Sequence, residues 1–225
     1  MSDLPSLRGP ILEPVSGGTP KQLVILCHGV GSDGQDLIDL ARYYQKVLPD
    51  AKFISPDAPF AYDMAPSGYQ WFSLQDMSPR AHLAGTQQAA PILDDFIDAQ
   101  LVTNGLTESE LALVGFSQGT MMCLYVGLRR ELQIAGIIGY SGALVDKELL
   151  AAEIKSRPPV LLVHGDADEV VPPMALSASV AGLKAAGVAV KHEMRPELGH
   201  GLDDRGIMVG MEFLADSFSV PLPAG

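Results

Sequence analysis

The chain has little of several features that would point to particular protein classes. Its 225 residues include two cysteines, one tryptophan and only 19% charged residues. No apolar run approaches the ~20 residues that a membrane-spanning helix needs. The first residues, Met1 to Pro5, lack the basic and apolar segments of a secretory signal peptide. We therefore expect a cytoplasmic protein that does not insert stably into a membrane.

The shortage of basic residues narrows the range of partners. The formal net charge is -12, and basic residues do not cluster beyond the pair Arg129 and Arg130. This charge disfavours binding to nucleic acid and to anionic membrane surfaces. Cys27 and Cys123 both lie in apolar runs, which is typical of free, buried thiols in a reducing compartment.

What the sequence does contain is a globular composition, 47% hydrophobic, with apolar runs that alternate with segments of helical spacing. Strands are expected at residues 11–15, 22–27, 52–55, 111–114, 134–140, 159–165 and 188–194. Helices are expected at residues 35–47, 81–103, 120–129, 147–155, 174–186 and 207–218. This alternation predicts an α/β fold, a mostly parallel central sheet with helices on both faces. Without a linker or repeat, the chain is expected to form one domain over residues 1–225, with its catalytic core at about 11–220.

Two features interrupt the regular pattern. Residues 56–80 are irregular and contain four prolines and the only tryptophan, Trp71. Irregular segments of this length are usually functional or mobile. Pro91 lies inside the helix expected at 81–103 and should kink or divide it.

The stretch Gly115-Phe116-Ser117-Gln118-Gly119 lies between a predicted strand and a predicted helix. A Gly-x-Ser-x-Gly turn in that context predicts a nucleophile elbow, whose strained turn holds the serine hydroxyl clear of the sheet. The glycines let strand and helix approach the turn, and the helix start presents backbone N–H groups to the reacting atom. The five letters also fit a glycine-rich turn with a solvated serine, so the interpretation depends on catalytic partners.

Candidate partners follow other strands. In a parallel sheet, ligands gather outside the carboxyl ends of the strands. Ser117, Asp168 and His200 follow apolar strands in the order expected for an α/β-hydrolase. A serine hydroxyl needs an adjacent base, for which His200 is the candidate. A carboxylate must then orient the imidazole; we favour Asp168 over Asp166, which is expected to brace the loop.

The transition state of such a reaction needs two preorganised N–H donors. We expect the backbone N–H groups of Gln118, which follows the nucleophile, and of Val30, in the loop after the strand at 22–27. A metal is not expected, because no tight ligand motif such as His-Glu-x-x-His is present. His28 and His164 are expected to brace their loops with hydrogen bonds.

Taken together, these motifs resemble the carboxylesterase/acyl-protein thioesterase family, also called the phospholipase/carboxylesterase family. The segments that carry the resemblance are His28 to Gly34, Trp71-Phe72, Gly115 to Gly119, His164 to Pro172 and Gly199-His200. The resemblance extends from about residue 11 to the last helix, and the combination is far more specific than any one motif.

The resemblance implies an α/β-hydrolase that acts on small-molecule acyl esters or thioesters of short to medium chain length, without a cofactor. It implies Ser117, Asp168 and His200 as a catalytic triad and Val30 and Gln118 as the oxyanion hole. It further implies an acyl pocket bordered by Trp71, Leu74 and Val170. Members of the family are often homodimers.

The sequence departs from the family pattern near the pocket. Cys27, Ser73 and Thr120 stand where relatives commonly have Leu, Asp and Gly, and Ala143 stands near a position where some acyl-protein thioesterases carry Trp. These changes leave substrate choice open. Trp71 is interpreted either as a pocket wall or as a hydrophobic plug.

We therefore expect a serine esterase for small esters. The alternatives are an acyl-protein thioesterase or lysophospholipase that acts on longer chains, a non-catalytic binding module on a hydrolase fold, and a serine peptidase.

Overall fold

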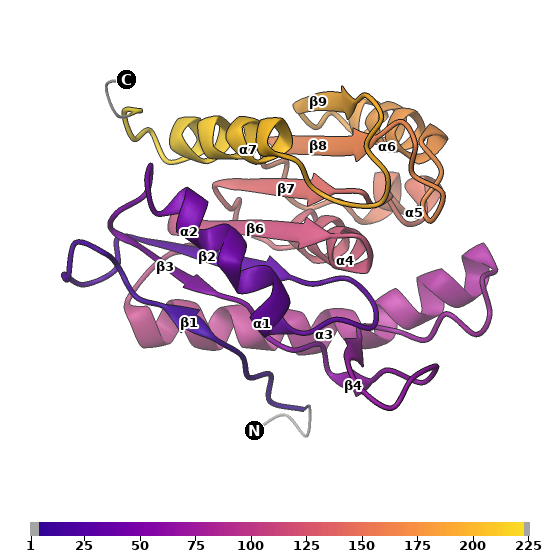
Figure 1. The fold of residues 1–225 in the computed structure, drawn as a ribbon, viewed down its shortest axis with the longest axis horizontal. Helices are drawn as coiled ribbons and strands as arrows, with labels where there is room; N and C mark the ends of the chain where they lie inside the picture. Colours follow the sequence, from indigo (N-terminus) through magenta and orange to yellow (C-terminus); the bar gives the residue numbers. More distant parts are fainter. Residues whose placement is uncertain (1–4, 223–225) are drawn as a thin grey trace.

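The computed structural model describes residues 5–222 of the chain. A seven-stranded sheet, in the order β1-β3-β2-β6-β7-β8-β9, forms its centre (Figure 1). Its strands are β1 (Ile11–Leu12), β2 (Gln22–Cys27), β3 (Ala51–Ile54), β6 (Leu111–Phe116), β7 (Gly136–Tyr140), β8 (Val160–Gly165) and β9 (Val190–Arg195). β1 is antiparallel to β3, and the other neighbouring strands of this sheet are parallel. The predicted mostly parallel sheet is confirmed.

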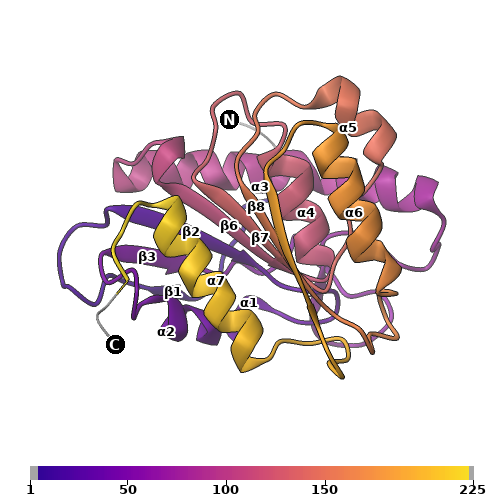
Figure 2. The same cartoon turned by 90° about the horizontal axis from the view of Figure 1, so that it is seen from above.

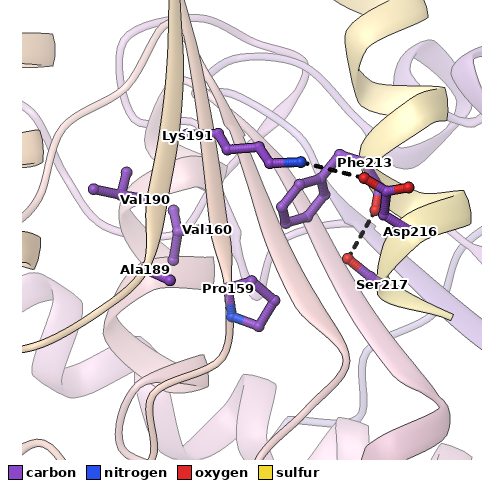
Figure 3. Close-up of a pocket in the computed structure, with 8 residues that line it drawn as sticks. All are labelled: Pro159, Val160, Ala189, Val190, Lys191, Phe213, Asp216 and Ser217. Carbon is purple, nitrogen blue, oxygen red and sulfur yellow. Dashed lines mark hydrogen bonds and ion pairs between the residues drawn. The ribbon is translucent and has the colours of Figure 1, made fainter. Parts of the chain in front are cut away.

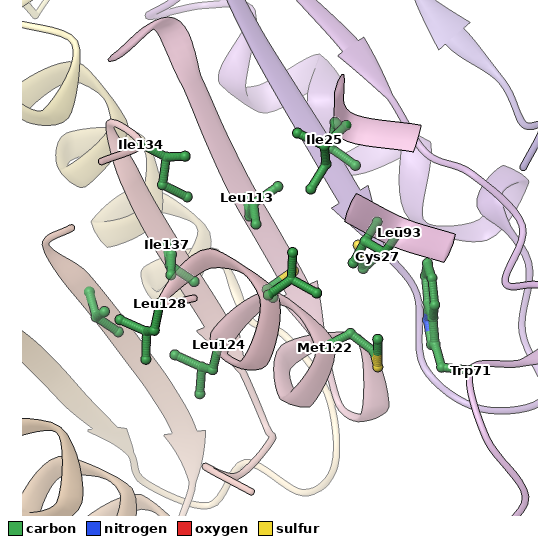
Figure 4. Packing of buried hydrophobic residues seen from close by; sticks show 14 of the residues in the cluster. Ile25, Cys27, Trp71, Leu93, Leu113, Met122, Leu124, Leu128, Ile134 and Ile137 are labelled. Atoms are coloured by element: carbon green, nitrogen blue, oxygen red, sulfur yellow. The ribbon is translucent and has the colours of Figure 1, made fainter. Parts of the chain in front are cut away.

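Helices cover both faces of the sheet (Figure 2). They are α1 (Gly34–Leu37), α2 (Ala41–Tyr44), α3 (Pro79–Asn104), α4 (Gln118–Gly127), α5 (Lys147–Glu153), α6 (Met174–Ala185) and α7 (Asp204–Ser217). On one face, α3, α4 and α6 pack on the sheet through a buried cluster that includes Leu183, together with Leu93 and Met122 (Figure 4). On the other face, α2 and α7 pack through Tyr44 and Leu214.

Parallel pairing brings the ends of distant strands together. Cys27, at the end of β2, pairs with Gly115 of β6, and Phe116 pairs with Tyr140 at the end of β7. The next strand, β8, ends at Gly165 beside Arg195 of β9. The segments after β2, β6, β7 and β8 therefore leave the sheet at one edge, where ligands of such folds gather.

The helix prediction at 35–47 needs correction, and of the two outcomes expected at Pro91, a kink or a division, the division does not occur. The helix expected at 35–47 is broken into α1, a 3-10 turn at Ile38–Leu40, and α2. Asp33 caps its start, because its Oδ1 accepts the backbone N–H of Asp36 at 2.9 Å. Pro91 does not divide α3, which continues from Pro79 to Asn104. Residues buried on both sides of Pro91, such as Ala89 and Leu93, anchor the helix to the core and offset the lost hydrogen bond.

The irregular segment 56–80 contains a short antiparallel ladder that the sequence did not predict, β4 (Phe60–Ala61) with β5 (Tyr69–Gln70). Trp71 and Phe72 follow this ladder directly and are buried. The segment is thereby anchored to the core beside the elbow. No helix within residues 5–222 is long and apolar enough to cross a membrane.

Candidate active site

The predicted strand–turn–helix elbow is present around Ser117. β6 ends at Phe116 and α4 begins at Gln118, so Ser117 alone makes the turn, with φ 53° and ψ -118°. A positive φ is uncommon for a residue with a Cβ and marks a strained backbone. A Cβ on Gly119 would lie 1.8 Å from the carbonyl oxygen of Cys27. Only glycine at 119 therefore lets α4 approach β2 closely enough to close the turn.

His200 and Asp168 form a direct hydrogen bond. His200 Nδ1 lies 2.8 Å from Asp168 Oδ2, and the other carboxylate oxygen, Oδ1, accepts the N–H groups of Val170 and Val171 at 2.9 Å each. Burial by itself raises the pKa of Asp168, but the hydrogen bonds from His200, Val171 and Val170 outweigh it and hold the pKa below its ordinary value. An ionised carboxylate only accepts hydrogen bonds, so the proton lies on Nδ1 and leaves Nε2 free as a base.

Two other groups flank this contact. His164 Nε2 lies 2.9 Å from the carbonyl oxygen of Val171 and 3.2 Å from Asp168 Oδ2. Asp166 is exposed, and its Oδ1 accepts the backbone N–H of Glu197 at 2.7 Å. His164 thus braces the acid loop, and Asp166 braces the neighbouring loop, as the sequence interpretation expected for both.

Ser117 and His200 line one cavity of about 200 Å³. Its lining consists of His28, Gly29, Val30, Ser32, Asp36, Leu37, Phe116, Ser117, Val170 and His200. The His200 ring rests against the Phe116 ring, with centroids 4.9 Å apart. The structure therefore brings together four residues that lie far apart in the sequence: Ser117, His200, Asp168 and Val30. Gln118, 2% exposed, completes the elbow as the first residue of α4.

The residues expected around the acyl pocket fall into different places. Val170 lines the cavity and is 64% exposed at its rim. Trp71 is fully buried in the core cluster (Figure 4) and does not line this cavity. Leu74 packs partly buried against the same cluster. The plug interpretation fits Trp71, because its ring faces core side chains and its indole N–H donates to a backbone carbonyl.

One bracing contact at the histidine loop was not predicted. Ser141, the first residue after β7, has φ 47° and donates its hydroxyl to the carbonyl oxygen of Gly201 at 3.2 Å. A serine directly after an apolar strand at this sheet edge was the signal that could have identified it. Ser141 thereby holds the residue next to His200.

His28 is held in its neutral form. The N–H of Ala58 donates to His28 Nε2 at 2.9 Å, so the ring proton lies on Nδ1, 2.7 Å from the carbonyl oxygen of Gly29. Burial lowers the pKa of His28, against opposing contributions from the Gly29 hydrogen bond and from Asp57, Asp33 and Asp36. Protonation would place a second N–H against the Ala58 donor, so His28 resists charging.

We expect this histidine to make folding stability depend on pH. Its folded pKa lies below its unfolded value of about 6.5, so the unfolded chain binds more protons and stability falls as pH drops through 6.5. The slope for one such group is at most about 1.4 kcal/mol per pH unit. The free energy of unfolding, measured with urea at several pH values between 8 and 5, should change less with pH for His28→Gln than for the parent chain.

The matched control is His192→Gln, because His192 is exposed on β9. Burial also lowers the pKa of His82, which adds the same slope to every variant. If the unfolding free energy of His28→Gln varied with pH as steeply as that of the parent chain, the assignment of a neutral, buried imidazole would be wrong.

A larger hollow of about 440 Å³ lies away from this site (Figure 3). It is lined by Pro159, Val160, Ala189, Val190, Lys191, Phe213, Asp216 and Ser217. These residues belong to the amino ends of β8 and β9 and to α7, at the edge of the sheet opposite Ser117. An exposed ion pair, Lys191 Nζ to Asp216 Oδ2 at 3.2 Å, borders it. The lining offers no histidine to act as a base, so the smaller cavity is the better candidate for chemistry.

Among residues 5–222, no group of three or more His, Cys, Asp or Glu side chains is placed to hold a metal ion.

Known proteins are similar to this chain in sequence. The family model described as phospholipase/carboxylesterase matches residues 14–218. Esterase YpfH of Escherichia coli K12 is 26% identical over 195 residues, which cover 86% of this chain and 82% of the relative. Acyl-protein thioesterase 1 of Schizosaccharomyces pombe is 33% identical over 165 residues, 69% of this chain and 72% of the relative.

Solved structures give the same fold. The crystal structure of esterase PE8 superimposes with a TM-score of 0.90 and 41% identity, over 94% of this chain and 99% of that one. Acyl-protein thioesterase 2 of Zea mays superimposes with a TM-score of 0.73 over 94% of this chain and 99% of that one; at 23% identity it supports the fold alone.

Proposed function

Because the chain belongs to the phospholipase/carboxylesterase family, we propose that it cleaves short- to medium-chain acyl esters with Ser117, His200 and Asp168. It is a serine hydrolase acting on carboxylic esters, which its esterase and acyl-protein thioesterase relatives support. The observation that carries the residue assignment is the 2.8 Å contact between His200 and Asp168 beside a cavity that Ser117 also lines.

The first step acylates the serine. His200 Nε2 takes the proton of the Ser117 hydroxyl as its oxygen attacks the ester carbonyl. The N–H groups of Val30 and Gln118 donate hydrogen bonds to the carbonyl oxygen as negative charge develops on it. A donor of this kind contributes about 3–4 kcal/mol of transition-state stabilisation. His200 then gives its proton to the leaving alcohol, and an acyl ester remains on Ser117.

The second step repeats the chemistry with water. Water enters beside His200, which removes one proton as the oxygen attacks the acyl carbonyl. The collapse of the second tetrahedral intermediate returns the proton to Ser117 and releases the carboxylic acid. Asp168 stays ionised throughout and stabilises the imidazolium that forms in each step.

The cavity supports a preference for short chains. Its volume of about 200 Å³ is below the 300–1,000 Å³ typical of pockets for drug-sized ligands. Leu37, Phe116 and Val170 supply its apolar lining. A short acyl group fits such a space, and a longer chain would have to leave it past the exposed side of Val170.

The second candidate, an acyl-protein thioesterase, has a specific observation in its favour. The Schizosaccharomyces pombe relative is 33% identical and bears that name. If this chain is an acyl-protein thioesterase, the long acyl chain of its substrate would lie along the open rim of the cavity at Val170. The two functions share the same residues and differ in chain length.

An acyl-chain ladder tests the proposal. With p-nitrophenyl esters and the matching acyl thioesters from C2 to C16, kcat/KM should rise by about three- to fourfold for each methylene that the cavity buries, then fall once the cavity is full. The optimum is expected between C4 and C8, and Ser117→Ala supplies the background rate. A maximum at C14–C16 thioesters would instead select the thioesterase.

Two further points remain predictions about this chain. A cytoplasmic location is supported by Cys27 and Cys123, which are free and buried. A homodimer is expected from the family resemblance alone.

A further inference from the structure

The side chain of Gln118 makes contacts that the reaction described above does not use. Its Oε1 accepts the backbone N–H of Trp71 at 2.8 Å, and its Nε2 donates to the carbonyl oxygen of Phe72 at 2.8 Å. The amide orientation is fixed by chemistry, because an N–H can only donate and a carbonyl can only accept. Both contacts are buried. The residue after the nucleophile is thus tied to the segment 56–80.

Trp71 extends the connection to the loop that carries Val30. The indole N–H of Trp71 donates to the carbonyl oxygen of His28 at 3.0 Å. The neighbouring Tyr69 pairs with the same loop, because the N–H of Gly31 donates to the Tyr69 carbonyl at 2.8 Å. Contacts from the segment 56–80 therefore hold the loop on both sides of Val30.

We propose that the Gln118 side chain is a positioning group of the oxyanion hole. Its amide fixes Trp71 and Phe72, and Trp71 in turn fixes the carbonyl of His28. One side chain thereby sets the spacing between the two backbone donors, its own N–H and that of Val30. We call the contacts among Gln118, Trp71, Phe72 and His28 the Trp71 clamp. This inference depends on the proposed function, because it assigns those two donors to the reaction.

The position of the two donors matters because each N–H stabilises the oxyanion only within a narrow range of distances from it. Oxyanion donors act at 2.7–3.1 Å from the position that the oxyanion will occupy, and loss of one costs about 10²- to 10³-fold in kcat. The two donors follow different strands, Val30 after β2 and Gln118 after β6, so each segment could relax independently. Side-chain contacts inside a buried region hold them with satisfied hydrogen bonds, which stiffens both loops at once.

Gln118→Glu is the most direct test, because a glutamate has the same size and keeps an oxygen that accepts the backbone N–H of Trp71. When this glutamate is ionised, an oxygen replaces the Nε2 donor and faces the Phe72 carbonyl, which is also an acceptor. At pH 8 and above, kcat should fall on the order of 10- to 100-fold, with KM changed less than about threefold because ground-state binding stays intact. At lower pH a protonated Glu can donate to Phe72 again, so the ratio of parent to variant kcat should shrink.

Trp71→Phe is the second variant, since it removes the indole N–H and keeps an aromatic ring in the core. A fall in kcat of several-fold with an unchanged KM is expected. Its effect and that of Gln118→Glu should be less than additive, because both act through one set of contacts. Ser67→Ala is the matched control, since Ser67 is an exposed residue of the same segment and should keep kcat within twofold.

The outcomes distinguish a positioning role of the Trp71 clamp from a structural role and from failure of the proposed function. If the parent chain hydrolyses esters and both variants keep kcat within twofold, the Trp71 clamp has no positioning role. If kcat, KM and thermal stability of Gln118→Glu all worsen together at every pH, its role is structural and the proposal is wrong. If Gln118→Glu fails to fold, the kcat and KM of Trp71→Phe decide. A parent chain without esterase activity would contradict the proposed function instead.

Discussion

Ser117→Ala is expected to lower kcat for p-nitrophenyl butyrate by about 10⁴- to 10⁶-fold, leaving KM nearly unchanged. The variant lacks the hydroxyl that forms the acyl ester, so only binding and the oxyanion donors remain to assist water. Release of p-nitrophenol at saturating substrate measures the change. Its fold should be retained, because alanine lacks only the hydroxyl oxygen and the elbow is held through the backbone of residue 117, whose N–H donates to the Tyr140 carbonyl and whose carbonyl accepts the Thr120 N–H.

Ser177→Ala is the matched control, since Ser177 is exposed on α6 and makes only a local bond to the carbonyl of Met174. It should keep full activity. A fluorophosphonate probe should label the parent chain and Ser177→Ala once each, at Ser117, and leave Ser117→Ala unlabelled. Labelling of Ser117→Ala, or retention of most of its activity, would show that another residue is the nucleophile.

Asp168→Asn is expected to lower kcat by about 10³- to 10⁴-fold. An asparagine at this place can turn its amide N–H₂ toward His200 Nδ1, which favours the tautomer with the proton on Nε2. That tautomer cannot accept the proton of Ser117. Because Asp168 is buried and lies only 2.8 Å from His200, the loss should persist at high salt, unlike that of a surface pair.

Asp166→Asn distinguishes this prediction from a general effect of removing charge. Asp166 lies two residues earlier, is exposed, and uses Oδ1 to accept the Glu197 N–H, a role that asparagine can keep. Its kcat should stay within about twofold of the parent, with the same pH profile. If Asp166→Asn were the inactive variant and Asp168→Asn the active one, the acid would have to be reassigned.

The sequence predicted the sheet well because its central strands are buried on both faces. β2 and β6 appear as uninterrupted apolar runs, and their burial in the structure explains why. Once those strands are parallel, their carboxyl ends share one edge, which is why polar residues after separate strands predicted one site. The elbow was predictable too, because its close approach excludes a Cβ at Gly119.

The misses have a common cause in tertiary packing. Pro91 is a local signal against a helix, yet the residues beside it are buried and hold α3 together. Trp71 carried no signal that distinguished a wall from a plug, since that depends on which segment covers it. The amide of Gln118 looked like a neighbour of the nucleophile only; its partners lie more than 40 residues away and could not be read from spacing.

The turn at Ser117 also sets a limit on how this molecule can change. A backbone held at φ 53° in a residue with a Cβ costs of order 1–3 kcal/mol that a glycine would largely recover. Selection of random mutants for thermal stability alone would therefore favour Ser117→Gly, which removes the hydroxyl. Laboratory evolution of a hardier variant should accordingly be run with continuous selection for turnover, since the easiest gain at this point of the chain is also the one that ends catalysis.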